Sequence, residues 1–323
     1  MFSHLFLIGV FLMIDFESDA APSSFSFDIA LVAVGYERRC RWITESFDIQ
    51  AHVKLGLEFG FLEEASYESN KAFFESRSYM MLNGIRSSTP ADISAHIISA
   101  AKNNSTSDGI SLFVDISSMS REMIANVVHG INMARNEHRI HVTSAYAPSK
   151  FSKSYGPSPI RSACPITPSL AGWSSRPEQP LGTVFGLGCE PGLALGAMQV
   201  LEPDKVWLFS PRGVDSKFDD AMRKPNQHID DIFDVTEFEY EITRSTVTRG
   251  RFEALLNAIE GDFRVIAVPF GPKIFSWLSI ITVVFTERSS VGVWAFSSKD
   301  AAFPVDRDAD GNVIWHSFTL NPK

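Results

Sequence analysis

Residues 110–121 read ISLFVDISSMSR, and residues 264–273 read RVIAVPFGPK. In each stretch an apolar run is followed by small or loop-forming residues and one cation, Arg121 or Lys273. Such a run is typical of a buried strand, and the residues after it are typical of a turn into a helix. At these turns an α/β sheet presents backbone N–H groups to anionic ligands. The two stretches therefore predict two related lobes that bind a phosphate-like group.

Strand-like and helix-like segments alternate along most of the chain. The apolar patterns predict strands at residues 27–34, 53–59, 110–116, 140–145, 183–187, 205–209, 239–243, 264–268 and 291–296. They predict helices at residues 41–47, 63–82, 90–102, 118–135, 193–201, 217–233, 249–259 and 274–285. This alternation predicts an α/β protein with two Rossmann-like lobes, each a mainly parallel sheet with helices on both faces.

The same patterns divide the chain into five parts. These are an N-terminal apolar extension (1–24), a first lobe (25–150), a Pro/Ser-rich crossover (151–180), a second lobe (181–300) and a C-terminal hairpin (301–323). The lobes share an order of landmarks, because residues 35–37 (GYE) correspond to 188–190 (GCE), and 115–121 correspond to 269–273. An internal duplication explains this order, and so does a chance likeness between two alternating α/β segments.

The composition is that of an ordinary globular protein. Of 323 residues, 45% are hydrophobic and 21% are charged, with a net charge of −9. An acidic chain is a poor duplex nucleic-acid binder, whereas a small anionic ligand needs only a few local cations. The three cysteines are widely spaced, which indicates neither a disulfide framework nor a zinc site. We expect no metal, no resident cofactor and a cytoplasmic protein.

The N-terminus leaves alternatives open. Leu5 to Ile14 form an apolar run that no Lys or Arg precedes, and the run is too short to span a bilayer. It resembles a secretion signal in length, but translation could also start at Met13, or the run could pack on the body of the protein. We expect no stable membrane insertion.

Both strand-to-helix turns contain candidate ligand-binding residues. In the first, Arg121 is suited to fork onto an anion, and three hydroxyls are suited to donate hydrogen bonds to it: Ser117, Ser118 and Ser120. The alternative is an ordinary helix cap in which Arg121 pairs with Asp115 or Glu122. In the second turn, Gly271 permits a close backbone approach and Lys273 supplies a point charge.

A third candidate segment, GYERR at residues 35–39, follows the first strand of its lobe. With Gly35 in the turn, Tyr36 can stack on a base. Glu37 can accept a hydrogen bond from a ribose hydroxyl or act as a general base. Arg38, or Arg39 beside it, can meet a phosphate. Glu190 is the matching carboxylate of the second lobe. The alternative for Glu37 is an ion pair with Arg41 at the start of a helix.

Other known sequence motifs for binding or catalysis are absent, or their residues do not have the required spacing. Residues 186–192 (GLGCEPG) match neither a dinucleotide-binding nor a P-loop pattern. No His-x-x-x-His pair or Gly-x-Ser-x-Gly elbow occurs. The Asp-rich run at 306–311 imitates a calcium loop but has Ser317 at the twelfth position, where a Glu is required.

The two loops DISSMSR and FGPK, each between a strand and an apolar helix, resemble the ligand loop of CARF (CRISPR-associated Rossmann fold) domains. In that family this loop binds nucleotide second messengers, commonly cyclic oligoadenylates, in prokaryotic antiviral defence. The loops depart from the usual Thr-Gly-Gly-Thr-Lys pattern, because Arg121 stands where Lys is usual and Pro272 replaces Thr. The resemblance implies a nucleotide sensor of bacterial antiviral defence, acting with a partner protein from the same operon.

The sequence is therefore consistent with three alternative functions. The first is a sensor that binds a nucleotide or another phosphate-bearing molecule. The second is an enzyme in which Glu37 or Asp115 is a general base that hydrolyses a nucleotide or its glycosidic bond. The third is a non-catalytic assembly partner, for which six Trp and 26 Phe provide interface material.

Overall fold

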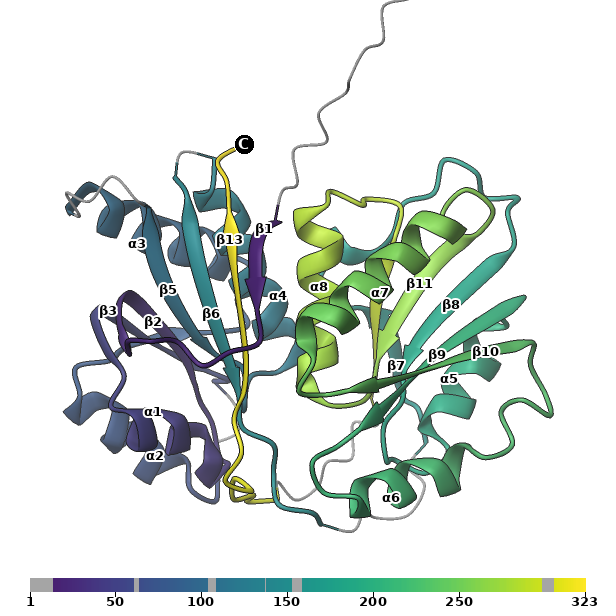
Figure 1. Ribbon diagram of the computed structural model, residues 1–323, viewed down its shortest axis with the longest axis horizontal. Coiled ribbons are helices and arrows are strands. Elements are labelled where there is room, and N and C mark those ends of the chain that lie inside the picture. Colours follow the sequence, from purple (N-terminus) through teal and green to yellow (C-terminus); the bar gives the residue numbers. More distant parts are fainter. Residues whose placement is uncertain (1–13, 61–63, 104–108, 137, 153–158, 298–304) are drawn as a thin grey trace, which may run out of the picture.

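The computed structural model describes residues 14–60, 64–103, 109–136, 138–152, 159–297 and 305–323. Two sheets lie side by side, each with helices on both faces (Figure 1). The first lobe has the parallel order β4-β3-β2-β5-β6, and the second has β10-β9-β8-β11-β12. The predicted α/β class with two Rossmann-like lobes is confirmed, and the identical order of five strands is what a duplication would produce.

The parallel strands of the two lobes have these bounds. In the first lobe they are β2 (Ser26–Val34), β3 (Gln50–Glu58), β4 (Met80–Asn83), β5 (Ile110–Asp115) and β6 (Ile140–Tyr146). In the second they are β8 (Leu181–Gly186), β9 (Lys205–Arg212), β10 (Val235–Glu241), β11 (Arg264–Pro269) and β12 (Gly292–Ser297). Each lobe adds an antiparallel strand beside its last parallel one. This is β13 (Ile314–Leu320) beside β6, with β1 (Ile14–Ser18) outside it, and β7 (Ser162–Pro165) beside β12.

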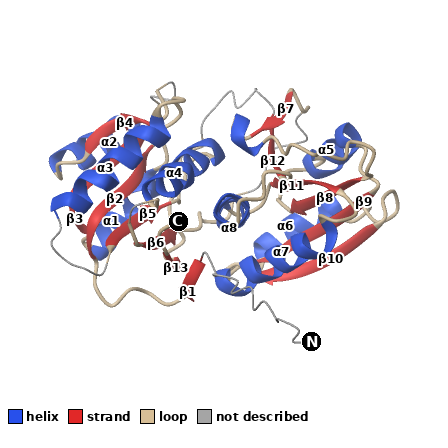
Figure 2. Cartoon of the chain, turned by 90° about the horizontal axis from the view of Figure 1, so that it is seen from above, coloured by secondary structure: helices blue, strands red, loops and turns tan. Residues whose placement is uncertain are grey.

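In each lobe one set of helices covers the face of the sheet turned toward the other lobe, and a second set covers the opposite face (Figure 2). The inner helices are α3 (Thr89–Asn103), α4 (Arg121–Ala134), α7 (Ser245–Ile259) and α8 (Lys273–Phe285). The outer helices are α1 (Trp42–Phe47), α2 (Tyr67–Ser76), α5 (Leu193–Leu201) and α6 (Lys217–Asn226). Helix α4 packs on α8, and their apolar side chains belong to one core that continues through both lobes. Helix α8 is apolar on all sides and buried from residue 274 to 285, so it requires partners all around it.

Several local predictions are wrong. The helix expected at 63–82 is shorter, because α2 ends at Ser76 and residues 80–83 form strand β4. Residues 314–320 do not form a C-terminal hairpin; they form β13 in the sheet of the first lobe. The extension and the crossover also contribute strands, β1 and β7. These three pairings join segments far apart in sequence, which local periodicity does not report. The apolar run predicted from Leu5 lies, up to residue 13, outside the described residues.

Strand β1 also links the first lobe to the second. The Glu17 carboxylate accepts a hydrogen bond from Arg249 Nη2 of α7 at 2.7 Å and lies 2.9 Å from His316 Nε2 of β13. Trp277 Nε1 of α8 donates to His316 Nδ1 at 3.2 Å. An indole only donates, so the neutral His316 ring carries its proton on Nε2 and donates it to Glu17. Burial raises the pKa of Glu17, but its bonds to His316 and Arg249 outweigh this and lower it.

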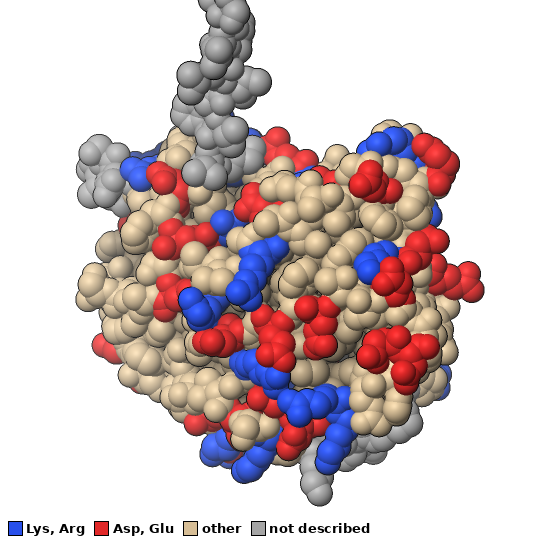
Figure 3. Space-filling model, turned by 45° about the vertical axis from the view of Figure 1, so that its right-hand side comes forward, with Lys and Arg blue, Asp and Glu red and all other residues tan. Residues whose placement is uncertain are grey.

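No helix in the described part of the chain is long and apolar enough to cross a membrane. The face seen in Figure 3 shows Lys and Arg side chains interspersed with Asp and Glu.

We predict that Glu17→Ala destabilises the fold by about 3 kcal/mol, because it removes the carboxylate that the buried His316 and the largely buried Arg249 share, although Arg249 keeps its pair with Glu253. The control is Glu45→Ala, which breaks the more exposed i,i+4 pair with Arg41 and is expected to cost less than about 1 kcal/mol. Urea unfolding followed by circular dichroism measures both. Equal losses would mean that β1 does not secure the lobes.

Candidate functional site

The carboxyl ends of the parallel strands of both lobes meet in one region between the lobes. The turn after β2 enters a short 3-10 helix (Arg38–Arg41), and the turn after β5 enters α4. In the second lobe the turns after β8 and β11 lead toward α5 and α8. Open α/β folds bind ligands at this edge of their sheets. Two adjoining cavities open here.

The first cavity, which we call the polar cavity, has a volume of about 160 Å³. Most of its lining consists of residues that the sequence predicted to bind a ligand. The lining residues are Gly35, Tyr36, Glu37, Phe59, Ser118, Ser120 and Lys273. The structure thus brings together residues from the turn after β2, the turn into α4 and the start of α8.

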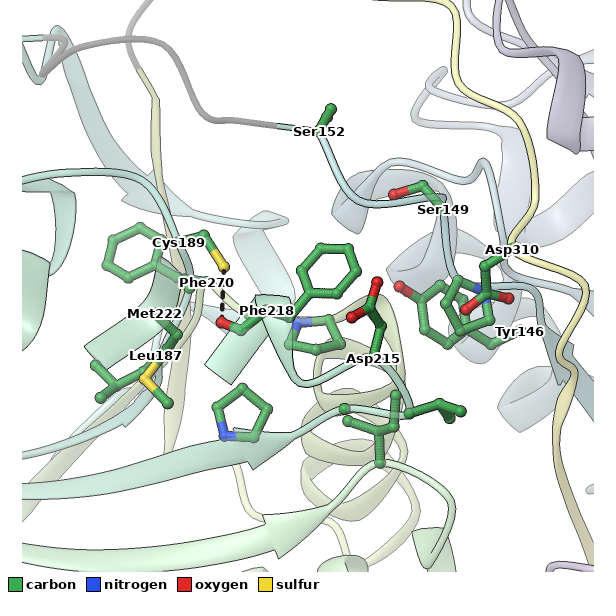
Figure 4. Close-up of a pocket in the computed structure, with 18 of the residues that line it drawn as sticks. Tyr146, Ser149, Ser152, Leu187, Cys189, Asp215, Phe218, Met222, Phe270 and Asp310 are labelled. Carbon is green, nitrogen blue, oxygen red and sulfur yellow. Dashed lines mark hydrogen bonds between the residues drawn. The ribbon is translucent and has the colours of Figure 1, made fainter. Parts of the chain in front are cut away.

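The second cavity, which we call the apolar cavity, has a volume of about 170 Å³ (Figure 4). It contains the other two second-lobe residues predicted from sequence, Glu190 and Gly271. A Cβ on Gly271 would come within 2.2 Å of the Leu187 carbonyl, so the close approach predicted for this glycine is made to the chain itself. The carboxylates Glu37 and Glu190 therefore line different cavities and do not form a symmetric pair.

A buried ion pair forms one wall of the polar cavity. Arg39 Nε donates to Glu37 Oε2 at 2.8 Å, and Arg39 Nη1 donates to the Ala147 carbonyl at 3.1 Å. Ser118 Oγ donates to Glu37 Oε2 at 3.3 Å. Burial raises the pKa of Glu37, but Arg39 and Lys273 outweigh it, so the pKa lies below its ordinary value. Glu37 is therefore an ionised carboxylate at neutral pH, paired with Arg39 and not with Arg41 as the alternative expected.

Lys273 is the unusual cation of the site. Burial lowers its pKa to about 7; Glu37 opposes this shift, and Arg39 and Arg121 add to it. Its Nζ donates to the carbonyl of Met119, in the loop before α4 of the other lobe. At neutral pH the amine is therefore balanced between its charged and neutral forms, and a nearby anion favours the charged form.

Arg121 makes the reciprocal contact. Its Nε donates to the Pro269 carbonyl at 2.6 Å and its Nη2 to the Phe270 carbonyl at 2.8 Å, both at the end of β11. The pairing of Arg121 with Asp115 or Glu122 is not seen. Burial lowers the pKa of Arg121, and Glu190 partly offsets this. The two cations chosen from sequence thus lie together, and each holds backbone carbonyls of the opposite lobe.

Arg121 itself lines neither cavity, and the same is true of three other predicted residues, Asp115, Ser117 and Arg38. Asp115 is buried, and its Oδ1 accepts a hydrogen bond from Ser117 N at 2.9 Å. Ser117 is buried as well, and its hydroxyl accepts from Ala147 N at 2.8 Å. Arg38 is exposed and pairs with Asp306 at 3.4 Å and Asp308 at 3.6 Å. In this structure Asp115 and Ser117 support the turn after β5, and Arg38 secures residues near the C-terminus.

Sequence reasoning missed one cation of the site. Arg307 lines the apolar cavity, and its guanidinium lies 3.9 Å from Glu37 Oε1. It comes from the segment predicted as a hairpin, and no local pattern connects it with Glu37. Tyr146, at the end of β6, lines the same cavity, and burial raises its pKa. Among the described residues, no group of three or more metal-ligating side chains comes together.

The arrangement defines an α/β protein of two Rossmann-like lobes with a polar cavity between them, which is lined by one cation, Lys273, and one carboxylate, Glu37. No protein-family model matches the chain, and no curated protein matches it. Among solved structures, one described as a universal stress protein from Pseudomonas aeruginosa UCBPP-PA14 is similar at 10% identity and a TM-score of 0.24. The match covers 83% of this chain and 92% of that one. A TM-score this low carries no information about function.

We predict that Asp115→Asn stabilises the protein at high pH only. Burial raises the pKa of Asp115 from 3.8 to about 6, so the folded state holds this proton more tightly than the unfolded state. Stability is therefore lost as the pH rises from about 4 to about 6, and the loss persists above that range. Asparagine keeps the oxygen that Ser117 N requires and has no charge to bury. The gain at pH 8 is expected to be about 3 kcal/mol.

The measurement is urea unfolding of wild type and variant near pH 4 and pH 8. Asp262→Asn, which changes an exposed carboxyl, is the control. A gain from Asp115→Asn that is the same at both pH values would contradict the raised pKa.

Proposed function

We propose that the protein binds a nucleotide, or another phosphate-bearing small molecule, with its phosphate in the polar cavity. The main observation behind this proposal is that Lys273 lines the cavity with a pKa of about 7, so its amine is only partly charged at neutral pH. The charges of Arg39, Arg121 and Arg307 contribute to lowering this pKa. A phosphate would relieve the repulsion among these cations. The role of a sensor in bacterial antiviral defence follows from the CARF-like resemblance of the loops around Arg121 and Lys273.

The charges around the polar cavity favour an anion. Lys273 and Glu37 line it, and Arg39, Arg121 and Arg307 lie near enough to lower the pKa of Lys273. Asp115 does not line the cavity but is near enough for Lys273 to affect its pKa. Because Asp115 has a raised pKa, its negative charge is partly absent near pH 6. The helices α4 and α8 also begin here, and the first turn of a helix presents N–H groups to anions. Ser120 caps α4 by accepting from Met123 N at 3.0 Å, and it also lines the cavity.

We predict that Arg307→Ala weakens nucleotide binding at least about tenfold, because it removes a cation beside the cavity. Isothermal titration with AMP, ADP, ATP and a cyclic oligoadenylate measures the loss. The matched control is Arg38→Ala, which removes an arginine paired with Asp306 and Asp308 outside both cavities. Arg38→Ala is expected to leave the affinity unchanged.

The same titration tests the part played by Lys273. A bound phosphate raises the pKa of Lys273 above about 7, so binding at pH 8 takes up a proton, and the affinity falls as the pH rises above 7. Titrations in buffers of different ionisation enthalpy measure this uptake. If wild-type protein binds none of the four nucleotides, the proposal is wrong.

A second candidate, an enzyme that hydrolyses a nucleotide or its glycosidic bond, is favoured by one observation. The ionised Glu37 and the Lys273 amine line the same cavity, where one can accept a proton and the other can exchange one. Asp115, the other candidate base, lines neither cavity. We expect Glu37→Gln to abolish turnover of labelled NAD or nucleoside phosphates while phosphate binding is kept or tightened, since a negative charge is removed. Absence of turnover by wild type would exclude the enzyme.

A further inference from the structure

The apolar cavity differs in chemistry from the polar cavity beside it. Its wall consists mainly of apolar and aromatic side chains of the second lobe, several of which are visible in Figure 4: Leu187, Phe218, Met222 and Phe270. Tyr146 closes the side nearest the first lobe. A cavity of about 150 Å³ lined by such groups accommodates a benzene ring. The apolar cavity, at about 170 Å³ and open on one side, therefore has room for a flat aromatic group.

Carboxylates lie around the apolar wall. Glu190, Asp215 and Asp310 all line the cavity, against one cation, Arg307. Asp215 Oδ1 accepts from Lys217 N at 3.0 Å, and Asp310 Oδ1 accepts from Asn312 N at 2.8 Å, so local backbone bonds fix both side chains in place. Three carboxylates repel a phosphate, and they accept hydrogen bonds from amino and hydroxyl groups. The group that fits here is uncharged, flat and rich in N–H or O–H donors.

The two cavities adjoin. Pro272 lines the apolar cavity and Lys273, the next residue, lines the polar one. Arg307 lines the apolar cavity and pairs at 3.9 Å with Glu37 of the polar cavity. One ligand can therefore place its phosphate beside Lys273 and its remaining part against Phe218 and Phe270.

We propose that the apolar cavity binds the nucleoside part of the ligand, with a purine base that carries an exocyclic amino group against Asp215 and the phosphate beside Lys273. This inference rests on the proposed phosphate site. It adds the direction in which the ligand lies and the class of base. The groups that stack on the base come from the second lobe, and the phosphate lies beside Lys273 of the second lobe, close to Arg39 and Arg121 of the first.

The test blocks the apolar cavity and leaves the polar one intact. Val214 lines the apolar cavity and its side chain is half exposed, so Val214→Trp fills the cavity with little cost to the fold. Val200, on α5, is equally exposed but lines neither cavity, and Val200→Trp is the matched control. ADP and inorganic pyrophosphate are titrated into wild type and both variants. We expect Val214→Trp to weaken ADP at least about tenfold and to leave pyrophosphate unchanged.

Two further variants test the apolar cavity in case the tryptophan side chain of Val214→Trp stays in solvent and does not fill it. Phe218→Ala removes an aromatic wall and is expected to weaken ADP but not pyrophosphate. Asp215→Asn keeps the oxygen that Lys217 N requires and weakens the acceptor for an amino group. It should therefore reduce the preference for ADP over IDP, whose base lacks the exocyclic amine.

Each outcome separates the two proposals. Binding of ADP that none of the three cavity variants changes, but that Arg307→Ala weakens, overturns the nucleoside site and leaves the phosphate site standing. If pyrophosphate binds wild type as tightly as ADP binds it, the nucleoside site is likewise overturned and the phosphate site still stands. If neither ADP nor pyrophosphate binds wild type, both proposals are wrong.

Discussion

The contact between α4 and α8 is the constraint on which the rest of the structure depends. Helix α8 is buried on every side, so a single sheet cannot cover it, and it packs on α7 of its own lobe and on α4 of the other. Because α4 and α8 both follow strands at the same edge of their sheets, packing them together brings the two sets of strand ends together. The cavities between the lobes are a consequence of this contact.

This contact places two cations where a helix disfavours them. Arg121 and Lys273 are the first residues of α4 and α8, and the first turn of a helix carries partial positive charge. The cost is offset across the interface, because each side chain donates to backbone carbonyls of the opposite lobe. For Lys273 the charged and neutral forms of the amine remain close in free energy at neutral pH, because burial lowers its pKa to about 7. A bound anion would therefore stabilise the charged lysine and the junction of the lobes together.

The sequence predicts much of this because much of it is local. Strands and helices alternate with clear periodicity, so the α/β class and the two mainly parallel sheets follow from the sequence. The order of the strands does not, and residues 80–83, which form β4, were expected in a helix. The strands β1, β7 and β13 were assigned to other structures, since only pairing with distant segments shows where they belong. The sequence also could not show which of Arg38 and Arg39 points toward the site. The short 3-10 helix after Glu37 turns Arg39 inward and Arg38 toward Asp306.

The two lobes share a strand order but not a chemistry. The turn after β2 buries Glu37 against Arg39, whereas the corresponding turn after β8 leaves Glu190 exposed on the rim of an apolar wall. A symmetric pair of sites would have required an arginine hydrogen-bonded to Glu190. Arg121 lies near enough for Glu190 to affect its pKa, but it donates to the carbonyls of Pro269 and Phe270. If the lobes arose by duplication, the first now has a buried ion pair at this turn and the second has an apolar wall. A ligand with one charged end and one flat, uncharged end fits this division better than a symmetric ligand does.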